Sequence, residues 1–374
     1  MTSPDGHVIQ ARAGLSEPDL VARGGVMLRR STRPAHEVRL SVVVPSYNTA
    51  DFVGAAVRSI LRQTMASLEV IVVDDGSTDD SVERVLALDD PRITCVRQAN
   101  RGLSGARNTG ILLARGAQIG FCDSDDLWHP EKAERHCAMM DADPSIGLTF
   151  SLSEYLTEEG RGTGQLLVSV CVEPDARALA ARNHIGNGST PIVRAQCFEQ
   201  AGLFDEKLNA CADMEMWFRI AALTPWRLRR IPEVLTGYRM RTGSMSVTYD
   251  YFLADARRVA DRMAQLVPEL PGAILRRGYA EAVRIASRKA FAAGNVALSR
   301  QLLIQAIQEY PLLPLTDVRA LAMVMLHVLS APLPVRHARA LYQGGHGVIR
   351  HMYAIAFGRR AGRGCGSVWT AAAA

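Results

Sequence analysis

The stretch that decides the fold is Leu68-Glu69-Val70-Ile71-Val72-Val73-Asp74-Asp75-Gly76-Ser77, a β-branched apolar run that ends in polar residues. Such a run predicts a strand that is buried on both faces, as in a parallel sheet. Similar runs lie at 40–45, 93–96 and 118–122, and helical patterns at 53–61, 82–86 and 104–115 separate them. This alternation predicts a doubly wound, Rossmann-like α/β domain, whose ligands bind beyond the carboxyl ends of the strands.

Acidic residues follow two of these strands directly. Asp123 and Asp125 follow the fourth strand, and in an extended chain residues two apart point the same way, so both carboxylates can reach one cation. Carboxylates together with diphosphate oxygens suit Mg²⁺ or Mn²⁺. Asp74 and Asp75 follow the second strand, where a carboxylate can accept from a uracil imide or a ribose hydroxyl. Both clusters are equally typical of turns and helix caps, and that interpretation stays open.

Two further segments carry candidate residues. Glycines in 100–108 allow a close approach of the backbone to phosphate, and Arg107 adds positive charge. Asp213 opens an apolar helix, which fits either catalysis or the ordinary preference of acids for helix starts. After the first strand the chain has Pro45-Ser46-Tyr47-Asn48 in place of a GxGxxG fingerprint, which disfavours a nicotinamide dehydrogenase.

Taken together, these segments resemble the pattern of glycosyltransferase family 2. The family's motifs occur in its order at 41–48, 73–79, 105–108, 121–126, 202–205 and 238–246, so the resemblance covers about 38–250. It implies the GT-A fold with a mixed central sheet, a nucleotide-sugar donor with UDP favoured, a divalent cation, and inversion at the anomeric carbon.

The resemblance also implies roles for single residues. Asp213 would be the general base, and Asp125, with Asp123, would bind the metal. Residues expected to contact the nucleotide are Pro45, Tyr47, Asn48, Asp75, Arg107, Asp123 and Ser124. The chain departs from the family twice: Ala212 replaces a Glu before the base, and Arg241 replaces a His that often contacts the metal. We expect Arg241 to contact the diphosphate instead.

The expected activity is therefore metal-dependent, inverting transfer of a hexose to a hydroxyl of a saccharide or lipid-linked acceptor, in the synthesis of cell-surface polysaccharide or glycan. A nucleotidyltransferase would need a basic glycine-rich loop where 45–48 stands. A glycosidase with paired carboxylates needs no nucleotide pocket. The remaining alternative is a catalytically silent member of the fold that binds sugar nucleotides or acts as a scaffold, against which the intact Asp125 and Asp213 argue.

Charge is distributed unevenly along the 374 residues, whose formal net charge is +5. Residues 251–374 hold 16 Lys and Arg against 6 Asp and Glu, a net charge of +10, and 1–250 hold 27 against 32, a net charge of −5. We expect a flexible extension over 1–37, the GT-A domain over 38–250, and a helical region over 251–374 with a tetratricopeptide-like hairpin at 286–310. Apolar helices at 318–329 and 348–357 are too short to cross a bilayer.

The last part of the chain carries an additional expectation. Residues 318–374 contain seven Arg and no Asp or Glu, which suits peripheral contact with an anionic membrane or, equally, a solvated helical cap or oligomer interface. The first thirty residues lack the apolar core of a signal peptide, and the seven cysteines include no CxxC pair. We expect a cytoplasmic protein, with any membrane contact at the inner face of the plasma membrane, and no nucleic-acid partner.

Overall fold

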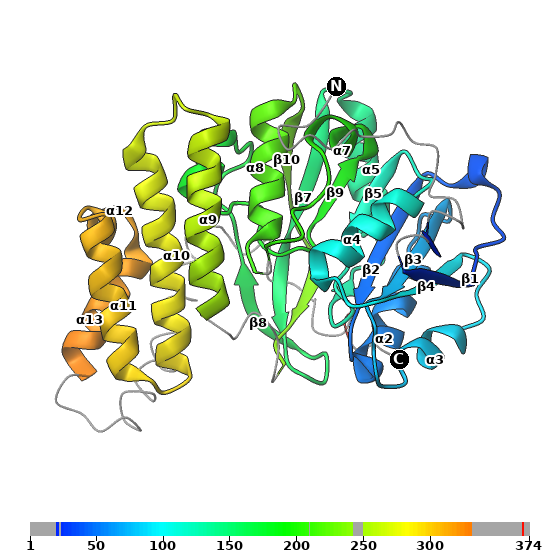
Figure 1. Cartoon of the computed structure of the whole chain (residues 1–374), viewed down its shortest axis with the longest axis horizontal. Helices are drawn as coiled ribbons and strands as arrows, with labels where there is room; N and C mark the ends of the chain where they lie inside the picture. The colour runs from blue at the N-terminus through cyan, green and yellow to red at the C-terminus, as the bar shows by residue number, and fades with distance from the viewer. Residues whose placement is uncertain (1–19, 22–23, 209, 242–249, 331–368, 370–374) are drawn as a thin grey trace. The chain divides into compact units, whose positions relative to one another are not determined.

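A computed structural model of the chain describes residues 20–21, 24–208, 210–241, 250–330 and 369 (Figure 1). The chain divides into two compact units. The sheet unit comprises 1–175, 184–241 and 364–374, and the helical unit comprises 176–183 and 242–363.

The first half of the sheet unit alternates strands and helices. The strands β2 (Leu40–Ser46), β3 (Leu68–Asp74), β4 (Ile93–Gln98) and β5 (Gln118–Phe121) pair in parallel in the order β4-β3-β2-β5. Between them lie α2 (Ala50–Leu61), α3 (Ser81–Leu86) and α4 (Gly102–Leu113). Each expected strand and helix of this half is present, and the predicted doubly wound class is confirmed.

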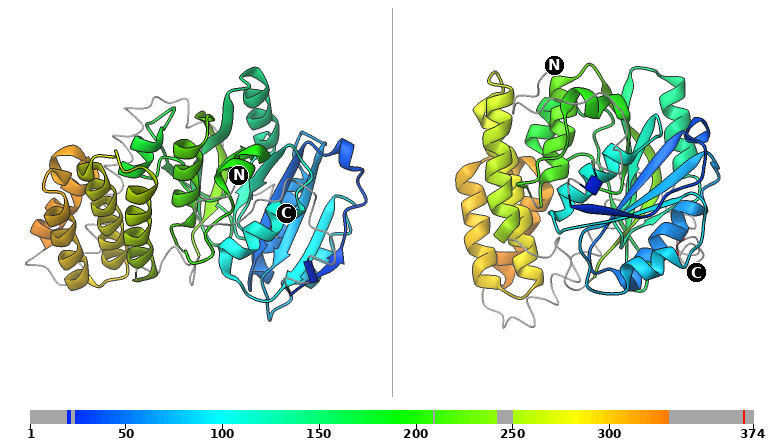
Figure 2. Two further views of the ribbon diagram at one scale, coloured as in Figure 1. Left: turned by 45° about the horizontal axis from the view of Figure 1, so that its top comes forward. Right: turned by 45° about the vertical axis from the view of Figure 1, so that its right-hand side comes forward.

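The second half extends the same sheet with mixed pairing. In order across the sheet, β9 (Pro191–Arg194) follows β5, then come β7 (Ile146–Leu156), β10 (Arg227–Arg239) and β6 (Leu127–Trp128). The strand β8 (Gly162–Leu167) pairs with β7 alone. β9 is antiparallel to both its neighbours, whereas β10 is parallel to β7. The helices of this half are α5 (Lys132–Ala142), α7 (Ala195–Ala201) and α8 (Ala212–Leu223), and Figure 2 shows helices on both faces of the sheet.

Side-chain alternation explains this layered packing. Val42 and Val44 of β2 form a buried cluster with Val57 and Ile60 of α2, so α2 covers one face of the sheet. Val43 points to the opposite face, where it meets Gly110 of α4. A Cβ at position 110 would lie 2.2 Å from Val43 Cγ1, so this glycine allows the close approach of helix and strand.

An ordered strand lies inside the expected extension. Residues of β1 (Gly25–Arg29) pair antiparallel with β4, and η1 (Ala35–Glu37) follows. The sequence indicated no strand here because β1 is an edge strand whose apolar side chains face solvent, with Val26 56% and Leu28 40% exposed. Burial on both faces, the signal used for the other strands, is missing.

Trp369 belongs to the core of the sheet unit, far in sequence from the rest of that core. Its side chain is fully buried in a cluster with Leu127, Leu156 and Val234. The indole Nε1–H donates a hydrogen bond of 2.8 Å to Glu154 Oε2. A residue more than a hundred positions beyond β10 thus completes an apolar slot between β6, β7 and β10.

The helical unit contains α6 (Ala176–Ala181), α9 (Asp250–Leu266), α10 (Gly272–Ala292), α11 (Val296–Glu309), α12 (Leu313–Thr316) and α13 (Val318–Ser330). The expected hairpin is formed by α10 and α11, with Gly294 at φ +88° in the turn. Asn295 caps α11 by accepting a hydrogen bond from the Leu298 amide. The expected helix at 318–329 is α13, and the apolar segment at 348–357 lies outside the described residues.

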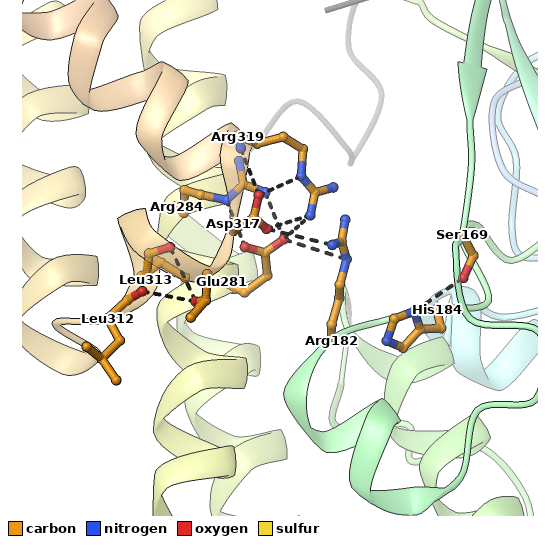
Figure 3. Close-up of polar contacts among 10 residues, drawn as sticks. Ser169, Arg182, His184, Glu281, Arg284, Leu312, Leu313, Asp317 and Arg319 are labelled. Atoms are coloured by element: carbon orange, nitrogen blue, oxygen red, sulfur yellow. Dashed lines mark hydrogen bonds and ion pairs between the residues drawn. The ribbon is translucent and has the colours of Figure 1, made fainter. Parts of the chain in front are cut away.

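A buried charge cluster joins three parts of the helical unit (Figure 3). Both carboxylate oxygens of Glu281, on α10, accept 2.8 Å hydrogen bonds from Arg284. Arg182, next to α6, lies 3.8 Å from Glu281 and 3.7 Å from Asp317, and Arg319 bonds both acids. Burial opposes the ionisation of Glu281, but the hydrogen bonds and charge of Arg284 hold its pKa below the usual value.

No helix in the part of the chain that the structure describes combines the length and the hydropathy needed to cross a membrane. The six described cysteines are free thiols, and five of them are buried.

Candidate functional site

Three neighbouring strands bring the candidate residues to one edge of the sheet. β2 lies between β3 and β5, and all three run in the same direction. Tyr47 and Asn48 follow β2, Asp75 follows β3, and Asp123 and Asp125 follow β5. The polar clusters expected at the strand ends therefore face a common region beyond the carboxyl edge.

The two adjacent acids after β3 have different partners. Asp74 is 1% exposed, lies 3.1 Å from Arg97 Nε, and accepts a hydrogen bond from the Ser77 amide, so it stabilises the turn. Asp75 Oδ1 accepts hydrogen bonds from Gln98 Nε2 at 2.7 Å and from the Arg101 amide at 2.9 Å. Burial raises the pKa of Asp75, and these hydrogen bonds oppose the rise. Asp75 is thus a fixed acceptor, and Asp74 is structural.

The other residues expected around the nucleobase differ in exposure. Tyr47 is half exposed, and Asn48 is exposed with its backbone in the left-handed region at φ +50°. The Asn48 side chain accepts a 2.8 Å hydrogen bond from the Thr78 amide, which holds this conformation. Pro45 and Ser124 are buried, so they shape the strand ends from within.

Arg107 connects two of the candidate acids. Its Nη2 donates a 2.8 Å hydrogen bond to Asp123 Oδ1, and its side chain is only 3% exposed. The guanidinium carbon lies 5.5 Å from the ring centre of Phe204. Gly188 makes room for this arrangement, because a Cβ there would lie 2.2 Å from Arg107 Nη2.

Asp213 lies in the first turn of α8, within electrostatic range of the same arginine. Burial raises the pKa of Asp213, the positive charge of Arg107 lowers it, and the negative charge of Asp123 raises it. The three side chains therefore form one charge system, in which Arg107 hydrogen-bonds Asp123 and acts electrostatically on Asp213.

Asp125 is held by a second arginine. Arg241 Nε donates a 2.6 Å hydrogen bond to Asp125 Oδ2, and the two side chains are 21% and 17% exposed. The next acid, Asp126, is fully buried and accepts hydrogen bonds from Ser189 Oγ at 2.6 Å and from the Arg239 amide at 2.9 Å. Burial raises the pKa of Asp126 well above the usual value. Asp126 is thus a structural group that joins the loop after β5 to β10.

The residues fit a divalent cation through carboxylate oxygens, the ligands that Mg²⁺ and Mn²⁺ prefer. Asp123 and Asp125 each give one oxygen to an arginine, which leaves the other for a metal ion. No group of three or more His, Cys, Asp or Glu side chains that could hold a metal occurs among the described residues. Diphosphate oxygens and water would have to supply the remaining ligands.

Sequence reasoning missed two residues that support the site. Ser189 accepts a hydrogen bond from the Asp123 amide at 2.9 Å and donates to Asp126. It therefore fixes the loop of residues 123–126 that follows β5. Phe52 lies under the guanidinium groups of Arg239 and Arg241, 5.3 and 5.5 Å from their central carbons. A serine in a loop and a phenylalanine in a helical pattern carry no signal of these contacts in the sequence.

The comparison with protein families gives one match: the model described as "Glycosyl transferase family 2" matches residues 41–199. A curated relative is the UDP-Glc:alpha-D-GlcNAc-diphosphoundecaprenol beta-1,3-glucosyltransferase WfaP of Escherichia coli. It is 36% identical over 121 residues, which are 32% of this chain and 47% of WfaP. The chain spans less than two thirds of the curated relatives it matches first, from 26% to 58% of their lengths.

Two solved structures are similar at the level of fold. The crystal structure of S. aureus TarS 1-349 in complex with UDP-GlcNAc has a TM-score of 0.55 at 21% identity, covering 81% of this chain and 88% of that chain. The mannosyltransferase PcManGT from Pyrobaculum calidifontis, in complex with GDP-Man and Mn2+, has a TM-score of 0.50 at 19% identity, covering 85% and 87%. The predicted GT-A fold is confirmed.

Proposed function

Because the chain belongs to glycosyltransferase family 2, we propose that it transfers a hexose from a nucleoside-diphosphate donor to a hydroxyl group of a saccharide or lipid-linked acceptor. The observation that carries the proposal is the charge system at the carboxyl edge. Arg107 bonds Asp123 and acts on Asp213, and Asp125 lies two residues along the same loop. Groups for a diphosphate and a base for an acceptor thus occur together.

The donor side of the site is assigned to the strand ends. Asp75 is a fixed acceptor that suits the imide N–H of uracil, which supports a UDP-sugar as the donor. Tyr47 and Asn48 are exposed beside it and would line the base pocket. UDP-Glc stands in the name of WfaP, TarS has been solved with UDP-GlcNAc, and PcManGT has been solved with GDP-Man, so a binding measurement must identify the base.

The acceptor side is assigned to Asp213. Its carboxylate would take the proton of the acceptor hydroxyl while the oxygen attacks the anomeric carbon and the bond from that carbon to the diphosphate breaks. Attack on the face opposite the departing group inverts the anomeric configuration. Burial raises the pKa of Asp213 and makes it a stronger base than an ordinary aspartate, and Arg107 limits the rise.

Asp125 and Asp123 would hold Mg²⁺ or Mn²⁺ next to the diphosphate. The cation would supply positive charge to the leaving group, whose negative charge grows as the sugar–phosphate bond breaks. Arg241 is hydrogen-bonded to Asp125 and would donate to oxygens of the diphosphate. The chain's own contribution is therefore to place one guanidinium and two carboxylates around the leaving group.

The test is a donor and acceptor screen with the full chain. A thermal-shift series with nucleoside diphosphates and their sugars, with Mn²⁺ or with EDTA, identifies the base and the need for metal. Saccharide and lipid-linked acceptors are then added, and release of nucleoside diphosphate is measured with the anomeric configuration of the product. We expect acceptor-dependent release with inversion. Binding of a nucleotide sugar without transfer to any acceptor would favour a catalytically silent member, and no nucleotide binding would contradict the proposal.

We place the protein in the cytoplasm, at the inner face of the plasma membrane, with peripheral contact through 318–374. Support comes from α13, where Val318, Leu321, Met325 and Val328 are 45–64% exposed and recur at helical spacing. The same segment has seven Arg and no acid, which suits anionic lipid. Synthesis of cell-surface polysaccharide on lipid-linked acceptors would require such a location.

Flotation with anionic liposomes tests the membrane contact. A truncation after Thr316 is unsuitable because it also removes Trp369 from the core of the sheet unit. The variant should instead replace Arg336, Arg339, Arg359 and Arg360 by Gln. We expect it to float less than the parent protein with anionic vesicles. Equal flotation, or a stable oligomer that remains in solution, would favour the interface alternative.

A further inference from the structure

Asp125, the acid assigned to the metal, already has a cationic partner in the chain itself. Arg241 Nε and Asp125 Oδ2 are 2.6 Å apart, a charge-assisted hydrogen bond. About a fifth of each side chain is exposed, so solvent and ligands can reach the pair. Either side chain can exchange the other for a ligand of the same charge, a metal ion for Asp125 or a diphosphate for Arg241, so that neither charge is left unpaired.

Arg241 is held less firmly than its neighbour Arg239. Arg239 donates to the carbonyl oxygens of Asp125 and Glu158 at 2.6 Å each, and its amide donates to Asp126. Among the described residues, Arg241 contacts the Asp125 carboxylate and the face of Phe52, which Arg239 shares. Two like charges over one ring repel each other, so Arg241 depends on a nearby negative charge.

A divalent cation and Arg241 would compete for Asp125. The Arg241 guanidinium already neutralises the Asp125 carboxylate. A metal ion bound to the same carboxylate would therefore be repelled by the guanidinium. A diphosphate changes this balance because its oxygens accept guanidinium donors better than one shared carboxylate oxygen does. Arg241 can turn to the diphosphate and release the second Asp125 oxygen.

We propose that Arg241 is an internal counter-cation of Asp125, which keeps the acid from binding divalent metal until a diphosphate accepts the guanidinium. The proposal rests on the proposed nucleoside-diphosphate donor. Metal and diphosphate then bind as coupled ligands, and by linkage each raises the affinity of the other. An isolated metal ion should bind weakly to the free protein.

Mn²⁺ binding to the full chain tests the proposal without any turnover. The electron paramagnetic resonance signal of the free ion measures how much Mn²⁺ remains unbound. In the absence of nucleotide, we expect Arg241→Ala to bind Mn²⁺ about tenfold more tightly than the parent protein, a typical size for coupling between sites. Arg241→Lys keeps the charge and should stay close to the parent. Arg135→Ala removes an exposed arginine paired with Glu131 and controls for the loss of net charge.

Two further measurements make the outcome specific. Asp125→Asn in the Arg241→Ala background should remove the gain, because the gain arises at that carboxylate. Saturating UDP should raise the Mn²⁺ affinity of the parent protein more than that of Arg241→Ala. Equal Mn²⁺ affinity of the parent and Arg241→Ala, with UDP binding intact, would overturn this inference and leave the proposed function in place. Failure of UDP to bind any variant, with or without Mn²⁺, would overturn the proposed donor and the coupling with it.

Discussion

Arg107 interacts with two carboxylates that have different proposed tasks. It bonds Asp123 on the donor side and lowers the pKa of Asp213 on the acceptor side. Its burial against Phe204 keeps the guanidinium in place. The charge that positions the donor and the base that activates the acceptor are therefore linked through one residue.

Replacing Arg107 by Gln should move the acid limb of the pH profile of kcat/KM to higher pH. Asp213 works as a base only when ionised, and its pKa is raised by burial but lowered by Arg107. Loss of the positive charge removes the lowering effect, so Asp213 stays protonated to a higher pH. Arg101→Gln, which removes an arginine paired with Glu206, is the control. An unchanged acid limb in Arg107→Gln would show that Arg107 does not influence the pKa of the catalytic base.

Asp213→Asn should abolish transfer while the donor still binds. The amide keeps the shape of the side chain but cannot take a proton, and loss of a general base costs roughly 10²–10⁴-fold in rate. Turnover and UDP binding by calorimetry are measured together. Asp51→Asn, in the exposed first turn of α2, controls for the loss of an acid. Near-normal turnover of Asp213→Asn would remove Asp213 from the mechanism.

Among the elements, α4 carries Arg107 and depends on a close approach to β2. Gly110→Ala places a Cβ 2.2 Å from Val43 Cγ1, so helix and strand must separate. We expect a loss of about 1–2 kcal/mol in the free energy of unfolding. Gly54→Ala in α2 is the matched control, because its nearest neighbour is the flexible Arg58 side chain at 3.5 Å. Denaturant unfolding measures both, and similar stability of the two variants would contradict the packing argument.

The helix α5 carries a buried charge into the centre of the sheet. Lys132 Nζ donates to the Thr190 carbonyl at 2.7 Å and to Thr236 Oγ1 at 3.0 Å, under full burial. Burial lowers its pKa from 10.5 to about 7. Between these two values the unfolded chain binds more protons than the folded one, so the free energy of unfolding should rise with pH.

Lys132→Met should remove this dependence on pH. Below pH 7 the cost of burying the charged lysine is fully present, and it is relieved as pH rises toward 10.5. The stability of the variant relative to the parent should therefore be highest near pH 6 and should fall toward pH 10, by at most about 5 kcal/mol. Loss of the lysine also leaves hydroxyl groups without a donor, which lowers the stability of the variant equally at pH 6 and at pH 10. The measurement is therefore the change with pH in the stability difference between variant and parent. If the stability of the parent and of Lys132→Met changed with pH in the same way, the lowered pKa of Lys132 would be refuted.

The first four parallel strands could be predicted because each is a β-branched run between helical patterns. The later strands could not, because β7 and β10 place Ser153, Glu154 and Thr236 inside the sheet and so show no apolar run. The candidate acids could be found from their places after the strands. The pairing of Asp125 with Arg241 could not, since the two are 116 residues apart and the antiparallel pairing of β10 with β6 brings their segments together.

At the scale of the whole molecule, the sheet unit is completed by a residue from beyond the helical unit. Trp369→Ala should cost about 3–5 kcal/mol in the free energy of unfolding, since it empties a buried slot. Trp369→Phe should lose less, because it fills most of the slot and lacks only the donor to Glu154. Trp226→Ala, at a partly exposed tryptophan, is the control. Stability unchanged by Trp369→Ala would show that the slot does not need this side chain.

The position of Trp369 also bears on the order of synthesis and on the genetics of the chain. The ribosome makes every strand of the sheet unit before the helices from α9 onward, yet the indole that fills the slot between β6, β7 and β10 is translated after all of them. Until then the nascent sheet unit has an open apolar slot. A stop codon anywhere between Arg241, the last proposed site residue, and position 369 would therefore leave every proposed site residue in place and still yield a sheet unit with an incomplete core.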